Sequence, residues 1–133
     1  KAHCYKILKA ASVLDAGKVI NPLAAKSVTM GGMSMGLSLA SREAFLYDEK
    51  GIILNANLRD YKLIGSGEEP DFLVEFLETP ELDGPFGARG IGEHGLIGMP
   101  AALINSLSSA AQIDLNKLPL TPEQIWQTKE GSG

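Results

Sequence analysis

A glycine-rich turn is the feature of this sequence that most constrains how the chain can fold. Residues 87–98 hold five glycines and one carboxylate, that of Glu93. Glycine permits backbone conformations with positive φ and lets another group approach closely. Apolar residues then repeat at helical spacing, at Leu96, Pro100, Leu103, Leu107 and Ala110. The pattern predicts an acid in a tight turn before a helix, with Pro100 either in the first helical turn or at a kink.

Extended segments are predicted on both sides of a long helix. Apolar alternation predicts strands over residues 4–14 and 72–77. One face of the first strand is expected to carry Tyr5, Ile7, Ala11 and Val13. One face of the second is expected to carry Phe72, Val74 and Phe76. A hairpin over residues 45–54, closed by Gly51, would make part of the sheet antiparallel, and residues 59–63 form a further short extended piece.

The long helix between these strands is predicted to start after Asn21, with Asn21 as its N-cap and Pro22 in its first position. Its apolar stripe, read as core, is Leu23, Met30, Met33, Leu37, Ala40 and Ala44. Its glycines, which would let another backbone pack closely, are Gly31, Gly32 and Gly36. A last helix is predicted after Thr121, where Gln124 would complete a capping box.

These elements predict one α+β domain over residues 1–133, in which two longer helices pack on a small mixed sheet. A net charge of −4 argues against binding to nucleic acid, and no stretch has the length of a membrane span. The single cysteine, Cys4, cannot form an internal disulfide and fits the cytoplasm. No metal-ligand spacing occurs, so no metal-binding residue is predicted. A strand at the very start, with Lys1 in place of methionine, indicates a piece of something larger or a trimmed domain.

Glu93 is the residue that points to chemistry. A carboxylate at a helix N-terminus is stabilised by about 0.3–1 kcal/mol, so a surface acid at a helix start explains it without any function. In the functional interpretation, neighbouring glycines leave the carboxylate room to reach a ligand as a general base. The G-x-G-x-x-G string at residues 90–95 lacks the βαβ unit of a dinucleotide site, and no Walker sequence follows. His94, directly beside Glu93, is poorly placed for a proton relay and is expected to lie in a loop.

Several short motifs follow one another along the chain. They are D-x-G-x-x-I-N-P at residues 15–22, the glycines Gly31 and Gly36, Tyr47 to Gly51, Asp60-Tyr61, G-P-x-G-A-[KR]-G-x-G-E at residues 84–93, and L-P-L-T-P-E at residues 118–123. Together they resemble the C-terminal part of the molybdenum-binding subunit of the xanthine dehydrogenase/aldehyde oxidase family of molybdenum hydroxylases. The chain would then be the C-terminal part of a molybdopterin-binding domain.

The resemblance implies a role for three residues. Glu93 would be the general base on a molybdenum-bound hydroxyl group, in the oxidation of a purine, heteroaromatic or aldehyde carbon with water-derived oxygen. Asn21 and Gly92 would be cofactor neighbours. The molybdenum–molybdopterin cofactor would be shared with the remaining molybdopterin-binding region, and iron–sulfur clusters and FAD would lie on partner domains or subunits. The other partner would be a small-molecule substrate.

One position departs from the family pattern. The family places a glutamine that bonds the pterin in a G-Q-x-E-G string, and the equivalent string here is residues 27–31, with Val28 at the glutamine position. Val28 cannot make that bond. Val28 favours an alternative to an enzyme part, an assembly or scaffold module that keeps the fold without the chemistry. A third alternative is an independent small-molecule binding domain.

Overall fold

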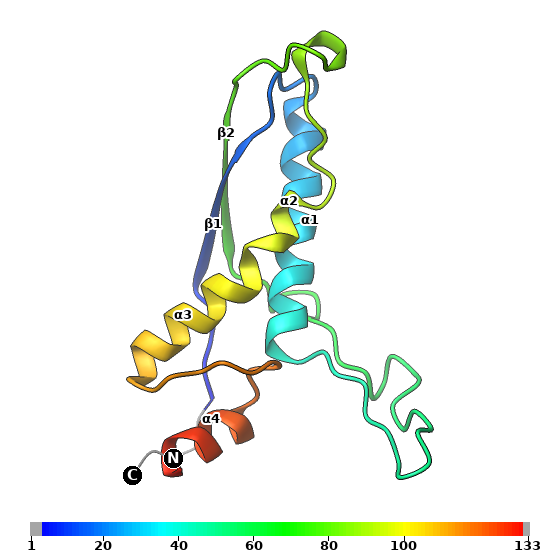
Figure 1. Cartoon of the computed structure of the whole chain (residues 1–133), viewed down its shortest axis with the longest axis vertical. Coiled ribbons are helices and arrows are strands. Elements are labelled where there is room, and N and C mark those ends of the chain that lie inside the picture. The colour runs from blue at the N-terminus through cyan, green and yellow to red at the C-terminus, as the bar shows by residue number, and fades with distance from the viewer. Residues whose placement is uncertain (1–3, 132–133) are drawn as a thin grey trace.

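One long helix is the tallest element of the molecule; the two strands run beside it, the third α-helix leads away from it at an angle, and the last α-helix lies beyond its lower end (Figure 1). The structure, a computed structural model, describes residues 4–131, so Lys1 lies outside the described residues. The elements in chain order are β1 (Lys9–Asp15), α1 (Pro22–Ser41), β2 (Asp71–Leu77), the 3₁₀ turn η1 (Pro85–Gly87), α2 (His94–Ile97), α3 (Met99–Ala111) and α4 (Pro122–Glu130). Within residues 4–131, none of the helices combines the length and apolar character needed to cross a bilayer.

The sheet consists of β1 and β2, which pair in parallel from Lys9 opposite Asp71 to Asp15 opposite Leu77. The predicted face of β2 is confirmed, since Val74 is buried and its neighbours Phe72 and Phe76 pack against the core. The α+β class is confirmed as well. The sheet is parallel, however, because the expected hairpin makes only an isolated antiparallel bridge, between Tyr47 and Ile53.

The first strand differs from its prediction in its first residue and in which of its side chains face the core. It begins at Lys9, and the adjacent residues Leu8 and Lys9 are both exposed, which shifts the alternation by one residue. Tyr5 and Ile7 therefore pack against the core, whereas Val13 is 62% exposed on the outer face. The expected extended piece at residues 59–63 is also wrong. It begins as a turn, in which the backbone N–H groups of Asp60 and Tyr61 both donate to the Asn57 carbonyl oxygen.

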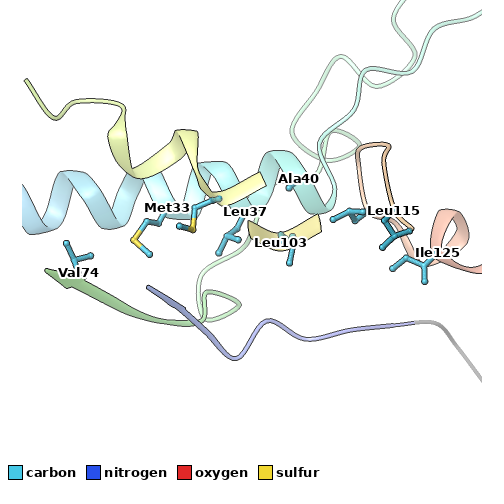
Figure 2. Close-up of a cluster of buried hydrophobic side chains, with 9 residues drawn as sticks. Met33, Leu37, Ala40, Val74, Leu103, Leu115 and Ile125 are labelled. Atoms are coloured by element: carbon cyan, nitrogen blue, oxygen red, sulfur yellow. The ribbon is translucent and has the colours of Figure 1, made fainter. Parts of the chain in front are cut away.

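Helix α1 begins as predicted. The Asn21 side-chain oxygen accepts a hydrogen bond from the Ala24 backbone N–H at 3.0 Å, and Pro22 occupies the first turn. The buried part of the apolar stripe is shorter than expected, because Leu23 is 78% exposed. The nine buried residues that form the core, most of them labelled in Figure 2, are Met33, Leu37, Ala40, Val74, Met99, Leu103, Leu115, Leu120 and Ile125. They join α1, β2, α3 and the C-terminal segment into one cluster.

The capping box of α4 forms only in part. The Thr121 hydroxyl accepts a hydrogen bond from the Gln124 backbone N–H at 3.2 Å, as predicted for an N-cap. The Gln124 side chain does not return to Thr121 but donates to the Lys117 carbonyl oxygen at 2.9 Å. The preceding loop folds back towards the helix, and so it offers Gln124 a tertiary acceptor.

Candidate active site

Glycines at the contact between α1 and α2 fix the position of Glu93. A Cβ atom added at Gly36 would lie 2.6 Å from the Leu96 carbonyl oxygen, and one at Gly32 would lie 3.0 Å from the Leu96 nitrogen. A Cβ atom at Gly95 would collide with the Thr29 carbonyl oxygen. The backbones of the two helices therefore touch at Gly32 and Gly36, as predicted, whereas the same prediction for Gly31 is wrong, because a Cβ atom there would meet no atom within 4 Å. Glu93 is the residue directly before α2, so this contact sets the position of its backbone.

Both sequence alternatives for Pro100 are realised in part. Helical residues begin at His94, well before Pro100, as the alternative with a kink requires, but this helix stops at Ile97. A second helix, α3, then begins at Met99 with Pro100 in its first turn, where a missing N–H leaves no hydrogen bond unmade. Gly98, between the two helices, keeps right-handed helical dihedral angles, with φ of −82° and ψ of −20°. His94 is the exposed first residue of α2 and does not lie in a loop.

A second contact holds the segment that leads into Glu93. The turn after β1 packs on residues 84–89: the Lys18 backbone N–H donates to the Gly87 carbonyl oxygen at 2.7 Å, and the Arg89 N–H donates to the Ala16 carbonyl oxygen at 3.0 Å. Gly17 and Gly87 have φ of +65° and +77°, which glycine adopts readily. Two motifs that are 60 residues or more apart in the sequence thus form one interlocked unit.

Charged side chains reinforce this unit. The Arg89 guanidinium group lies 3.4 Å from an Asp15 carboxylate oxygen and 3.2 Å from a Glu81 carboxylate oxygen. The backbone N–H groups of Gly17 and Thr79 donate to Asp15, and together with Arg89 they hold the pKa of Asp15 below its ordinary value. Sequence reasoning missed this role of Arg89. Its only local signal was its place in the G-A-R-G string, because its partners are remote in sequence.

The side chain of Glu93 is exposed and is not used as a helix cap. Among residues 4–131 it has no hydrogen-bond or ion-pair partner. A Cβ atom added at Gly90 or Gly92 would meet no atom within 4 Å, so the backbone on this side of the turn faces open space. The carboxylate is therefore free to act on a group that approaches the turn.

An apolar groove of about 360 Å³ lies beside this turn. It is lined mainly by the turn after β1, the first half of α1 and the segment before Glu93, including Val19, Ile20, Val28, Ile91 and Gly92. The structure thus brings Gly92 and Val28 together. It does not bring Asn21 to the groove lining, and the Asn21 side-chain oxygen is engaged as the cap of α1. Among the described residues, no three His, Cys, Asp or Glu side chains are grouped so that they could hold a metal ion.

A larger groove of about 680 Å³ lies at the opposite end of α1, where its lining includes Tyr5, Arg42, Glu68 and Thr121. The Arg42 guanidinium group pairs with Glu68 at 2.8 Å. The Gly65 N–H and Arg42 lower the pKa of Glu68, and burial raises the pKa of Tyr5. The ion pair is half-exposed and contributes little stability. This groove is remote from Glu93, and of the motifs described above only L-P-L-T-P-E reaches it, through Leu120, Thr121 and Pro122.

Comparison with known proteins identifies the family and the fold. A family model described as the molybdopterin cofactor-binding domain matches residues 3–70. The chain belongs to this family. The family resemblance noted from the motifs is thereby confirmed, and molybdopterin is the cofactor of the family.

Relatives extend the likeness of this molybdopterin-binding chain beyond residue 70. It is 36% identical over 132 residues to subunit gamma of the 6-hydroxypseudooxynicotine dehydrogenase complex of Paenarthrobacter nicotinovorans, a match that covers 96% of this chain and 16% of the relative. It is 35% identical over 117 residues to the xanthine dehydrogenase molybdenum-binding subunit of Escherichia coli O157:H7, covering 87% of this chain and 16% of the relative. The chain therefore spans only 16% of the length of these curated relatives.

Solved structures show the same fold. Quinoline 2-oxidoreductase from Pseudomonas putida 86 superposes with a TM-score of 0.90 at 27% identity, covering 97% of this chain and 17% of that chain. The aldehyde oxidoreductase from Desulfovibrio desulfuricans ATCC 27774 gives a TM-score of 0.86 at 30% identity, covering 96% of this chain and 14% of that chain. These proteins are named as enzymes, which does not favour the alternative of a non-catalytic assembly module.

Proposed function

We propose that this chain contributes the general base of a molybdenum hydroxylase, and that Glu93 is that base. The observation that carries the proposal is the placement of Glu93. Its carboxylate is exposed and not used as a helix cap, and the turn that carries it is fixed by backbone contact with α1. A group that must collect a proton needs this combination of a fixed position and a free acceptor.

The residues around the turn fit an approaching cofactor. The open backbone at Gly90 and Gly92 leaves space for a group to come close, and the adjacent groove is apolar. Gly92 would contact the cofactor, and Asn21 retains its side-chain NH₂ group for a neighbouring contact while its oxygen caps α1. Molybdopterin, when bound, supplies the redox-active metal that accepts electrons from the substrate. Val28 offers only apolar contact where the family has a glutamine.

In the proposed reaction, the Glu93 carboxylate accepts a proton from a water-derived nucleophile, whose oxygen then forms a bond to an electron-poor carbon of the substrate. The C–H bond at that carbon breaks, and its hydrogen leaves with both bonding electrons, which the cofactor would accept. The contacts of Gly32, Gly36 and Gly95 hold α2, and so they set the distance over which this proton moves. The substrate would be a purine, another heteroaromatic compound or an aldehyde. The names of the relatives support this range, since they include a xanthine dehydrogenase subunit, a nicotine 6-hydroxylase and an aldehyde oxidoreductase.

The proposed partners follow from the length of the relatives. The remaining molybdopterin-binding region would complete the cofactor site, and iron–sulfur clusters and FAD on other domains or subunits would carry electrons away. The subunit names of several relatives support an assembly of this kind. We place the assembly in the cytoplasm, which the single cysteine of this chain supports.

Replacement of Glu93 by glutamine in the assembled enzyme tests the proposal. Glutamine keeps the size of the side chain but cannot accept the proton, so turnover should fall by about 10²–10⁴-fold. Molybdenum content, measured by elemental analysis, should stay unchanged. Glu123→Gln is the matched control, because Glu123 is also an exposed acid at a helix start, in α4, and it lies far along the chain from the turn. Turnover of Glu93→Gln close to that of Glu123→Gln would refute the assignment.

A further inference from the structure

An arm of residues 43–62 projects from the C-terminal end of α1, away from the sheet and from α3 and α4 (Figure 1). The arm exposes an unusual amount of apolar surface. Six large apolar side chains, three on each side of the turn at residues 48–51, are between 38% and 62% exposed. These side chains, named here the apolar flank, are Phe45, Leu46, Tyr47, Ile52, Ile53 and Leu54. Contiguous exposed patches of this kind mark interaction surfaces in soluble proteins.

Hydrogen bonds within the arm hold its backbone in place, so the apolar flank is exposed on a folded segment. The buried Asn55 side chain accepts from the Leu46 N–H at 2.9 Å and donates to the Ala44 carbonyl oxygen at 2.7 Å. At the tip, the Asp48 carboxylate accepts from the backbone N–H groups of Lys50 and Ile52, both at 2.8 Å. These bonds fix the backbone conformation in which the six apolar side chains are exposed.

The two ends of the arm are joined to each other, and the residue just beyond the arm is bonded to α1. The Tyr61 hydroxyl donates to a Glu43 carboxylate oxygen at 2.7 Å, and the Tyr61 ring lies 5.1 Å from that of Phe45. Directly beyond the arm, the Ile64 N–H donates to the Ser38 hydroxyl oxygen in α1 at 3.0 Å. The arm is thus a preorganised surface at a defined place on the domain, which lowers the entropy cost of packing something against it.

The comparisons indicate what covers the flank. The match to quinoline 2-oxidoreductase covers 97% of this chain, which is too much to omit an arm of this length, so the arm is part of the shared fold. In that protein the shared fold makes up only 17% of the chain. The same chain therefore holds a large remainder that is available to pack against the arm. Interfaces that never open are the most apolar ones, as this flank is.

We propose that the apolar flank is the surface on which the rest of the same polypeptide packs, with the charged turn of residues 48–50 outside the contact. A segment of the same polypeptide has a high effective concentration at the arm, which a second copy of the chain or a separate subunit lacks. The identity of this occupant rests on the proposed function, in which the remaining molybdopterin-binding region belongs to the same molecule.

Thiol labelling of the full polypeptide tests this proposal. Leu46→Cys and Ile52→Cys place thiols in the flank, and Lys50→Cys places one in the charged turn as the matched control. Peptide mass spectrometry reads maleimide labelling at each position, so other cysteines do not interfere. We expect the two flank thiols to react at least 100-fold more slowly than the control thiol in the native protein, and all three to react alike in urea. This protection should not depend on protein concentration.

Three results would overturn the proposal. Flank thiols that react within fivefold of the Lys50→Cys thiol would show an uncovered flank. Protection that grows with protein concentration would assign the flank to a second copy, and protection that requires added electron-transfer subunits would assign it to one of them. Hydroxyl-radical footprinting of Phe45 and Tyr47 in the unmodified protein gives the same comparison without any variant. Turnover is not measured, so failure of the Glu93 assignment would leave these results unaffected.

Discussion

The contact of α1 with α2 can be tested by adding one methyl group at a time to α1. In Gly36→Ala, the new Cβ would lie 2.6 Å from the Leu96 carbonyl oxygen and 2.8 Å from the Met99 Cβ. Neither atom can move by a side-chain rotation, so the helices must separate. In Gly31→Ala, the new Cβ would meet no atom within 4 Å. Gly31 lies in the same helix and is exposed, which makes it the matched control.

The expected magnitude follows from two opposing effects. Alanine is favoured over glycine inside a helix by about 0.8–1 kcal/mol, and both variants gain this amount. Only Gly36→Ala also incurs the cost of overpacking, which is about 1–3 kcal/mol. The helix term cancels in the comparison, so the free energy of unfolding should be about 1–3 kcal/mol lower in Gly36→Ala than in Gly31→Ala. Gly31→Ala itself should be more stable than the unmodified protein.

Urea unfolding of the purified polypeptide, followed by circular dichroism, measures this difference. Turnover of the assembled enzyme provides a second readout, because separation of α2 from α1 moves Glu93, and a displacement of about 1 Å can cost about 100-fold in rate. Equal stability of the two alanine variants would refute the close approach of the two backbones. Full turnover in a destabilised Gly36→Ala protein would instead refute the idea that this contact sets the position of Glu93.

Two further predictions concern the ends of the elements around the site. Asn21→Ala removes the side-chain acceptor for the Ala24 N–H and should lower the free energy of unfolding by about 1 kcal/mol, measured by urea unfolding; unchanged stability would contradict the cap. The folded-state pKa of Asp15 is lowered by the N–H groups of Gly17 and Thr79, so its stabilising effect is complete above the unfolded pKa of about 3.9 and is lost as pH falls through the lower folded value. Asp15→Asn should therefore flatten the loss of stability below about pH 4, and an unchanged acid profile in thermal unfolding would contradict this.

Features set by neighbouring residues could be predicted from the sequence. The Asn21 cap, Pro22 in the first turn of α1 and the Thr121 cap of α4 are all found where they were expected. Each depends on hydrogen bonds that span three or four residues, so the sequence contains all of the interacting groups close together. The inward face of residues 72–77 and the close packing at Gly36 were also evident from local patterns.

Features that depend on remote partners could not be predicted in this way. The pairing of Lys9 with Asp71 places both Leu8 and Lys9 on the surface, and so it decides which side chains of β1 face the core. The local alternation of apolar residues does not contain that information. The failure of the hairpin to extend the sheet has the same origin, because residues 45–54 form an arm and do not lie beside β2. Gln124 completed no capping box because the Lys117 carbonyl oxygen was within its reach.

The sequence by itself determined the glycine turn, the acid within it and the helix that follows, and its ordered motifs identified the family. Only the tertiary structure decided that Arg89 meets Asp15, that Gly92 and Val28 line one groove, and that the Glu93 carboxylate stays free of a helix cap. The physical reason is the separation in sequence between the residues that interact. Backbone conformation and capping depend on residues a few positions apart, whereas the position of a catalytic side chain depends on packing between segments that are distant in the sequence.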